Sequence, residues 1–278
     1  MIENFIQGIH SYQFLQHALV TAITIGIVSG ALGSLIILRG MSLMGDAISH
    51  AVLPGVALSY ILGQHFFVGA LFFGIVASIL ITYIHSHSKV KTDTAIGIIF
   101  SGFLALGVIL IGVANSTTDL FHILFGNILA VTQEDMFLTI FISAFIICLL
   151  IYLYKPFLIT SFDNTMAKAF GMNTQFYHYI LMIMLTVVAV TGMQSVGTIL
   201  IVSLLITPAA TAYLLTKHLW SMMILAAFFG AFASFIGLFI AYSFNIAAGS
   251  CMVLVSTVLF LITFIIHQGI HLKKGSLL

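Results

Sequence analysis

The sequence predicts an all-α integral membrane protein that folds as a polytopic helical bundle. Of its 278 residues, 62% are hydrophobic and 5% are charged, whereas about a quarter of an ordinary soluble domain is charged. Apolar runs long enough to cross a bilayer recur from about residue 18 to residue 267. Phe and Gly, with 25 and 23 residues, are spread through these runs, as is usual in membrane helices.

Charged and turn residues divide the apolar runs into nine candidate spans, with eight as the alternative count. The expected spans cover residues 18–38, 41–63, 66–85, 94–113, 136–154, 177–192, 195–215, 219–243 and 249–267. Six of the breaks between them are short, and in chain order they read RG, QH, SHSKVKTD, MQ, TKH and FNIAA. The two longer breaks follow residue 113 and Tyr154. Within the break after residue 113, residues 120–131 read LFHILFGNILAV. This stretch is too short to cross a hydrocarbon core of about 30 Å, so we expect it to be interfacial or re-entrant.

The distribution of basic residues predicts the orientation, because short cytoplasmic loops concentrate Lys and Arg. With nine spans and the N-terminus outside, the C-terminus and every basic residue fall on the cytoplasmic side: Arg39, Lys89, Lys91, Lys155, Lys168, Lys217, Lys273 and Lys274. A tenth span at 120–131 would place the first three opposite the other five, which argues against it. We therefore expect one transmembrane domain, 1–278, in the cell membrane.

Several other classes of protein are excluded. The start MIENFIQGIH has an acid and no basic region before an apolar core, unlike a cleavable signal peptide, so residue 1 is expected to begin the mature chain. A net charge of +1 without a basic stripe argues against nucleic acid. The sequence contains neither HExxH nor GxSxG nor GxxxxGK(S/T), which argues against a hydrolase and against a P-loop for ATP. Cys148 and Cys251 lie in apolar runs and are expected to pack between helices.

The second span contains the one acid that the spans place well inside the bilayer, Asp46, in the stretch MSLMGDAISHAVLPG. An ionised Asp at a helix centre costs about 2.5–3.5 kcal/mol, so a favourable interaction must offset it. His50 lies one helical turn further along the same face. A carboxylate and an imidazole at this spacing can converge on one divalent ion such as Mn²⁺, Fe²⁺ or Zn²⁺. The alternatives are packing, in which Asp46 bonds His50, a neighbouring helix or Arg39, and a proton relay.

The rest of this helix suits a site that faces a cavity. Small residues recur at every fourth position: Ala47, Ala51, Gly55 and Ser59. This ridge lies about 100° from Asp46 and His50, so the helix can pack by one face and present the pair with another. Pro54 removes a backbone hydrogen bond and is expected to open the helix above the pair. Two donors do not complete a shell of four to six ligands, whereas a two-fold dimer would bring two pairs together.

Four stretches carry a resemblance to a known family: MSLMGDAISHAVLPGVALSY, KTDTAIGIIFSGFLALGVIL, LFGNILAV and VGTILIVSLLITPAATAYLL. Over nearly its whole length the chain resembles the permease subunits of the manganese, zinc and iron ABC importers, most closely the manganese branch. The resemblance implies that Asp46 and His50 belong to the metal pathway and that two protomers bring them together. It implies three partners: a second permease protomer, a cytoplasmic ABC ATPase dimer and an extracytoplasmic solute-binding protein. No cofactor is expected to be permanently bound.

The cytoplasmic loop at about 155–178 is the longest of the expected cytoplasmic segments. Within it, DNTMAKAFG has the signals of a short helix, with Asp163 as N-cap, Lys168 in the last turn and Gly171 as C-cap. The family resemblance implies that this is the coupling helix that docks on the ATPase. The alternative is an interfacial connector without a partner.

The function expected from the sequence is therefore transport of Mn²⁺ as the permease subunit of an ABC importer, and not an enzymatic reaction. A zinc or iron permease, a proton- or ion-coupled secondary metal transporter and a structural scaffold remain as alternatives. Among the other histidines, His85 and His87 are expected to be solvated at the interface. His122, beside Asp119, is a minor candidate for meeting an arriving ion.

Overall fold

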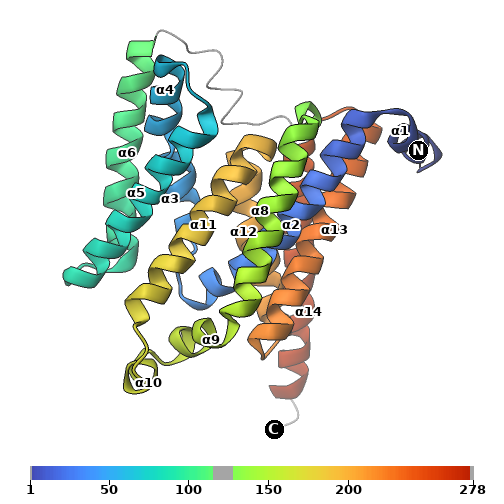
Figure 1. Cartoon of the computed structure of the whole chain (residues 1–278). Helices are drawn as coiled ribbons and strands as arrows, with labels where there is room; N and C mark the ends of the chain where they lie inside the picture. Colours follow the sequence, from blue (N-terminus) through green and yellow to red (C-terminus); the bar gives the residue numbers. More distant parts are fainter. Residues whose placement is uncertain (1, 115–127, 276–278) are drawn as a thin grey trace.

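The computed structural model describes residues 2–114 and 128–275, and the side chains of residues 2–4, 6, 114 and 270–275 lie outside this description. All regular elements of the described residues are helical (Figure 1). They are α1 (Ile2–Ser11), α2 (Gln13–Leu38), α3 (Met44–Ala51), α4 (Leu53–Leu62), α5 (Phe66–His87), α6 (Thr92–Ala114), the 3-10 turn η1 (Ile128–Ala130), α8 (Gln133–Tyr152), α9 (Tyr154–Phe162), α10 (Asn164–Ala169), α11 (Thr174–Val196), α12 (Thr198–Leu215), α13 (Leu219–Phe244) and α14 (Ala248–Gly275).

The described part of the chain contains nine stretches long and apolar enough to cross a membrane, which confirms the predicted fold class and count. Eight are single helices, and the second span, Met44–Leu62, consists of α3 and α4. Of the segment expected at 120–131, residues 120–127 lie outside the described residues, as do Asp119 and His122.

The chain alternates between the two ends of the bundle, and α9, α10 and the C-terminus lie at one end, opposite the N-terminus (Figure 1). We call this the α10 end. The segments that carry Arg39 and the lysines all lie there, as the predicted sidedness requires. That this end faces the cytoplasm stays a prediction.

Small residues determine how closely the central helices approach. At the crossing of α2 and α13, a Cβ added to Gly26 would lie 2.7 Å from the carbonyl carbon of Gly230. A Cβ on Gly237 would lie 2.5 Å from the Cα of Met252 on α14. Each distance is far below an ordinary contact, so the backbones meet there because no side chain separates them. Small residues on α13 therefore let it pack closely against α2 and α14.

Hydroxyl pairs join neighbouring helices inside the bundle. The side-chain oxygens of Ser78 on α5 and Thr186 on α11 lie 2.5 Å apart. Similar pairs at 3.3 Å and 3.2 Å join α8 to α11 and α12 to α14. Such hydrogen bonds satisfy polar groups that the bilayer core cannot solvate. Helices α11 and α12 follow one another directly at Gly197, whose φ of 88° favours glycine.

Two local expectations need correction. The sequence reading begins the first span at residue 18 and contains no earlier helix, whereas α1 precedes it and buries Phe5 against Phe235, Phe239 and Tyr242 of α13. Both cysteines are free; Cys251 is buried as expected, but Cys148 is exposed on α8 and does not pack between helices. An apolar run predicts burial in a bilayer, and it does not distinguish lipid from a neighbouring helix.

Candidate metal site

The second span is broken directly above the predicted pair. Helix α3 ends at Ala51, Val52 connects, and α4 begins at Leu53. Pro54 lies in the first turn of α4 and has no N–H to donate to the carbonyl of residue 50, one turn earlier. The expectation that Pro54 opens this helix is therefore confirmed. The break leaves α3 as a helix of eight residues that carries both Asp46 and His50.

The small-residue ridge and the polar pair lie on different faces of this span. Ala47 and Ala51 are buried, and Gly55 is in backbone contact with Gly69 of α5. Helix α3 packs against α5, α6, α11 and α12. The side chains of His50 and Asp46 nevertheless retain 31% and 51% of their accessible surface. One face thus packs while the other presents the pair, as the sequence predicts.

The pair itself is close but not tightly bonded. The Nε2 atom of His50 lies 3.5 Å from Oδ1 of Asp46, beyond an ideal charge-assisted hydrogen bond. The other ring nitrogen, Nδ1, is buried without a hydrogen-bond partner in the described part of the chain. The ring meets that of Phe100 on α6 edge to face, with centroids 5.4 Å apart. A purely structural pair would be expected to satisfy these polar atoms, so the geometry fits a ligand-binding pair better.

The packing alternative in which Asp46 reaches Arg39 is wrong. Arg39 instead donates from Nε to Oγ of Ser161 at 3.0 Å and from Nη2 to Oγ1 of Thr160 at 2.8 Å, both on α9. Its Nη1 lies 3.3 Å from Nδ1 of His178 on α11. Burial lowers the pKa of Arg39 to about 10, so the guanidinium stays charged at neutral pH. This side chain ties the end of α2 to α9 and α11.

One chain supplies few donors for a metal ion. The described residues contain no group of three or more His, Cys, Asp or Glu side chains able to hold a metal. Met41 and Met44, which are close in sequence to the pair, are buried in the core and do not extend its exposed face. The chain by itself therefore offers Asp46 and His50 alone, half of the smallest usual metal shell.

The segment predicted to couple to an ATPase contains the expected short helix. Asp163 is the N-cap of α10, and its Oδ1 accepts a hydrogen bond from the backbone N–H of Met166 at 2.8 Å. Lys168 lies in the last turn, as predicted. The C-cap is Phe170 and not Gly171 as predicted; Gly171 follows it with a φ of 74°. Backbone bonds from Gly171 N–H to the Lys168 carbonyl and from Met172 N–H to the Ala167 carbonyl complete a Schellman motif, which favours glycine at this position.

Sequence reasoning missed three exposed apolar side chains around α10. Phe162, Met166 and Phe170, which we call the apolar triplet, are 64%, 51% and 65% exposed. Ala167, in contrast, is buried against the bundle. Their spacing of four residues in an expected loop was a sequence signal that could have identified them. A connector that contacts only solvent has no need of large apolar side chains.

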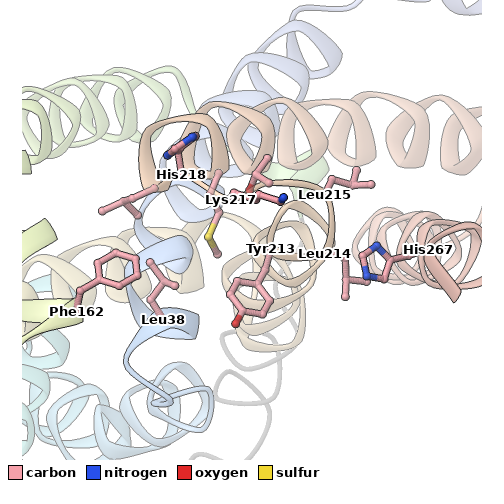
Figure 2. A pocket seen from close by; sticks show the side chains of 11 residues that line it. Leu38, Phe162, Tyr213, Leu214, Leu215, Lys217, His218 and His267 are labelled. Atoms are coloured by element: carbon pink, nitrogen blue, oxygen red, sulfur yellow. The ribbon is translucent and has the colours of Figure 1, made fainter. Parts of the chain in front are cut away.

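A groove of about 700 Å³ lies beside the apolar triplet at the α10 end. Figure 2 shows Phe162 on one side and His267 of α14 on the other, with Leu38 and Tyr213 between them. Lys217 and His218, from the turn between α12 and α13, complete its basic rim. The triplet and the groove together form a large, partly apolar surface at this end of the bundle.

Comparison with known proteins agrees with this architecture. The chain is 65% identical over 277 residues to the manganese import system permease protein ScaB of Streptococcus parasanguinis, which covers 100% of this chain and 99% of the relative. It is 57% identical over 272 residues to the manganese transport system membrane protein MntC of Listeria monocytogenes, with 97% of each chain covered. A solved structure of PsaBC from Streptococcus pneumoniae in complex with Fab superimposes with a TM-score of 0.86 and 64% identity over 95% of each chain. The model of the ABC 3 transport family matches residues 11–267, and the chain belongs to this family.

Proposed function

We propose that this chain is the permease subunit of an ATP-driven ABC importer of divalent transition-metal ions, and that the ion is manganese. The observation that carries the proposal is the half-exposed pair Asp46 and His50 on the broken second span. The relatives named for manganese import support the choice of ion. Residues 1–278 form one transmembrane domain in the cell membrane, and the chain transports its substrate without changing a covalent bond.

The spacing of the two donor atoms suits a divalent ion. Nε2 of His50 and Oδ1 of Asp46 are 3.5 Å apart. An ion bound to both at metal–ligand distances of about 2.1 Å would have an angle of about 110° between these two ligands. This angle is near tetrahedral, and an octahedral ion would draw the two atoms to roughly 3 Å of each other. Both side chains are partly exposed, so this adjustment requires no rearrangement of the backbone.

A second copy of the chain would complete the site. Two donors per chain leave at least two positions of a metal shell unfilled. A two-fold axis beside α3 would add the same two donors from a second protomer. The ion would then bind between subunits, in the path from an extracytoplasmic solute-binding protein to the cytoplasm. The solute-binding protein would dock at the end of the bundle opposite α10.

The α10 end would receive the ATPase dimer, which supplies the energy that this chain cannot obtain for itself. The apolar triplet offers exposed contacts for that partner, and segment 155–178 supplies the coupling helix, with its N-cap at Asp163 and the terminating glycine at Gly171. Arg39 connects this segment to the site, because it bonds Thr160 and Ser161 on α9 and precedes α3 by a short turn. A displacement of α9 and α10 would thereby reach the helix that holds the metal pair.

Reconstitution tests the proposal. The chain is placed in vesicles with its ATPase and solute-binding protein, and ATP-dependent entry of radioactive manganese, zinc and iron is measured in parallel. We expect manganese entry to require all three components and to be lost with His50→Ala, while the complex still assembles. His65→Ala is the matched control, because His65 is exposed and makes no side-chain cap bond to α5.

Each rival function predicts a different result. Entry driven by an ion gradient with this chain alone would identify a secondary transporter. Preferential entry of zinc or iron would retain the importer and change its ion. Full uptake by His50→Ala would leave a scaffold as the remaining interpretation, and loss of assembly would assign the histidine to packing.

A further inference from the structure

A polar cavity at the α10 end shares no lining residue with the metal pair or with the apolar triplet. Its volume is about 230 Å³, and it is lined by Arg39, which follows α2, and by residues of α5, α9, α10 and α11. This is smaller than the roughly 300–1,000 Å³ of sites for drug-sized ligands. At about 30 Å³ per water molecule, it has room for a small polar group of the size of a phosphate.

The charges around the cavity are all of one sign. Arg39 and Lys168 line it, together with His85 and His178, and its lining includes no acidic residue. No carboxylate of the described residues lies within ion-pairing distance of Arg39, whose partners are two hydroxyls and an imidazole. A partly buried guanidinium without a counter-ion is unusual, because buried charges are normally paired. Two fixed cations also disfavour a metal ion here.

The remaining donors converge in a manner that suits phosphate. Arg39 uses three of its five N–H groups on protein atoms, which leaves two on its terminal nitrogens. Because Nδ1 of His178 faces the Arg39 donor, the neutral ring carries its proton on Nε2. Thr174 and Gln175, in the first turn of α11, also line the cavity and add the positive end of a long helix.

We propose that this cavity binds a phosphate group, held by Arg39 and Lys168 with the first turn of α11. The group belongs either to the headgroup of an anionic phospholipid or to a free phosphate. The planar fork of arginine matches phosphate oxygens. Lys168, which also lines the cavity and has no ion pair in the described part of the chain, adds a second charge. Bound phosphate would join α2, α10 and α11. This assignment does not depend on the proposed transport function.

Binding to the purified full-length chain tests the assignment in a phosphate-free maltoside detergent. One arm titrates inorganic phosphate against acetate at matched ionic strength and follows the thermal unfolding midpoint. The other compares phosphatidic acid with diacylglycerol of the same chains by native mass spectrometry. We expect one or both phosphate-bearing ligands to bind, and acetate and diacylglycerol not to. Binding in the first arm alone identifies free phosphate as the ligand, and binding in the second alone identifies a lipid headgroup.

Charge-removing variants locate the site. Lys168→Gln should weaken phosphate binding about tenfold, or about 1.4 kcal/mol, because it removes a charge-assisted hydrogen bond. Arg39→Lys keeps the charge but removes the planar guanidinium, so it should weaken phosphate binding by a similar factor. This variant keeps the test possible if Arg39→Ala fails to fold. Lys91→Gln is the matched control, because Lys91 is exposed and does not line the cavity. Absence of binding in both arms, equal binding of acetate, or equal weakening by Lys91→Gln would overturn the assignment.

Discussion

Replacement of Asp46 by asparagine separates the metal-binding interpretation from a packing role. The variant keeps the size of the side chain and removes its charge. In the native chain the carboxylate is half exposed, and the one ion-pair partner that it has in the described part is His50 Nε2 at 3.5 Å. No buried hydrogen bond is therefore lost. The free energy of unfolding should change by no more than about 0.5 kcal/mol, as for an ordinary surface substitution.

The effect on transport should be much larger. Loss of a group that merely orients a metal ligand lowers metal affinity about 10- to 100-fold, so loss of a direct anionic ligand should lower it by at least about 100-fold, or about 2.7 kcal/mol. In a two-fold site both carboxylates are lost at once, which increases the effect. A neutral amide oxygen is also a poorer donor for manganese than a carboxylate.

Two measurements on the same preparation check this prediction: ATP-dependent manganese entry into vesicles, and thermal unfolding of the purified complex. Asp93→Asn is the matched control, because Asp93 is an exposed acid in the first turn of α6. Uptake should fall at least 100-fold for Asp46→Asn and stay unchanged for Asp93→Asn, with similar unfolding midpoints. Normal uptake by Asp46→Asn would refute the reasoning, and a large loss of stability would assign Asp46 to packing.

Three further substitutions test the fold and the coupling segment. Gly55→Val should lower the free energy of unfolding by about 1–3 kcal/mol, because a Cβ at this position would meet the backbone of Gly69. Gly112→Val is the control, because a Cβ there meets nothing within 4 Å. Equal unfolding midpoints of the two variants would contradict this. Phe170→Ser should reduce co-purification of the ATPase at least about tenfold without loss of stability, and full co-purification would exclude the docking role. Asp163→Ala should remove about 1 kcal/mol of cap energy and speed amide hydrogen exchange at Met166 about fivefold; unaltered exchange would show that the cap is dispensable.

The spans could be predicted because a membrane helix is specified by local properties. About 20 apolar residues without charge are enough to identify each one, and the nine predicted spans correspond to those observed in the described residues. The break at Val52 was equally predictable, since Pro54 lacks a donor wherever it lies in a helix. Helix α1 was missed because its ten residues are too few for a span and pack through contacts with α13 that are distant in sequence.

In the coupling segment, local sequence signals predict the ends of the helix but not the exposure of its side chains. The N-cap at Asp163 and the terminating glycine at Gly171 follow from residue type, because each acts on the backbone of its own helix. The C-cap itself is one residue earlier than predicted, at Phe170. The exposure of Phe162 and Phe170 depends on the backbone turn at Asp163 between α9 and α10 and on which neighbours cover them. The polar cavity likewise gathers side chains from four helices and from Arg39, the residue after α2, and no spacing within one helix could have indicated it.

The sequence by itself determined the number of membrane helices, their breaks and the presence of Asp46 and His50 on one face of α3, because each depends on hydrophobic length, proline chemistry or the helical repeat. Only the tertiary structure decided that this face stays open while Ala47 and Ala51 are buried. It also decided that Arg39 bonds α9 rather than Asp46. The physical reason is that exposure and hydrogen-bond partners depend on how neighbouring helices pack, and close packing depends on contacts between residues far apart in the chain.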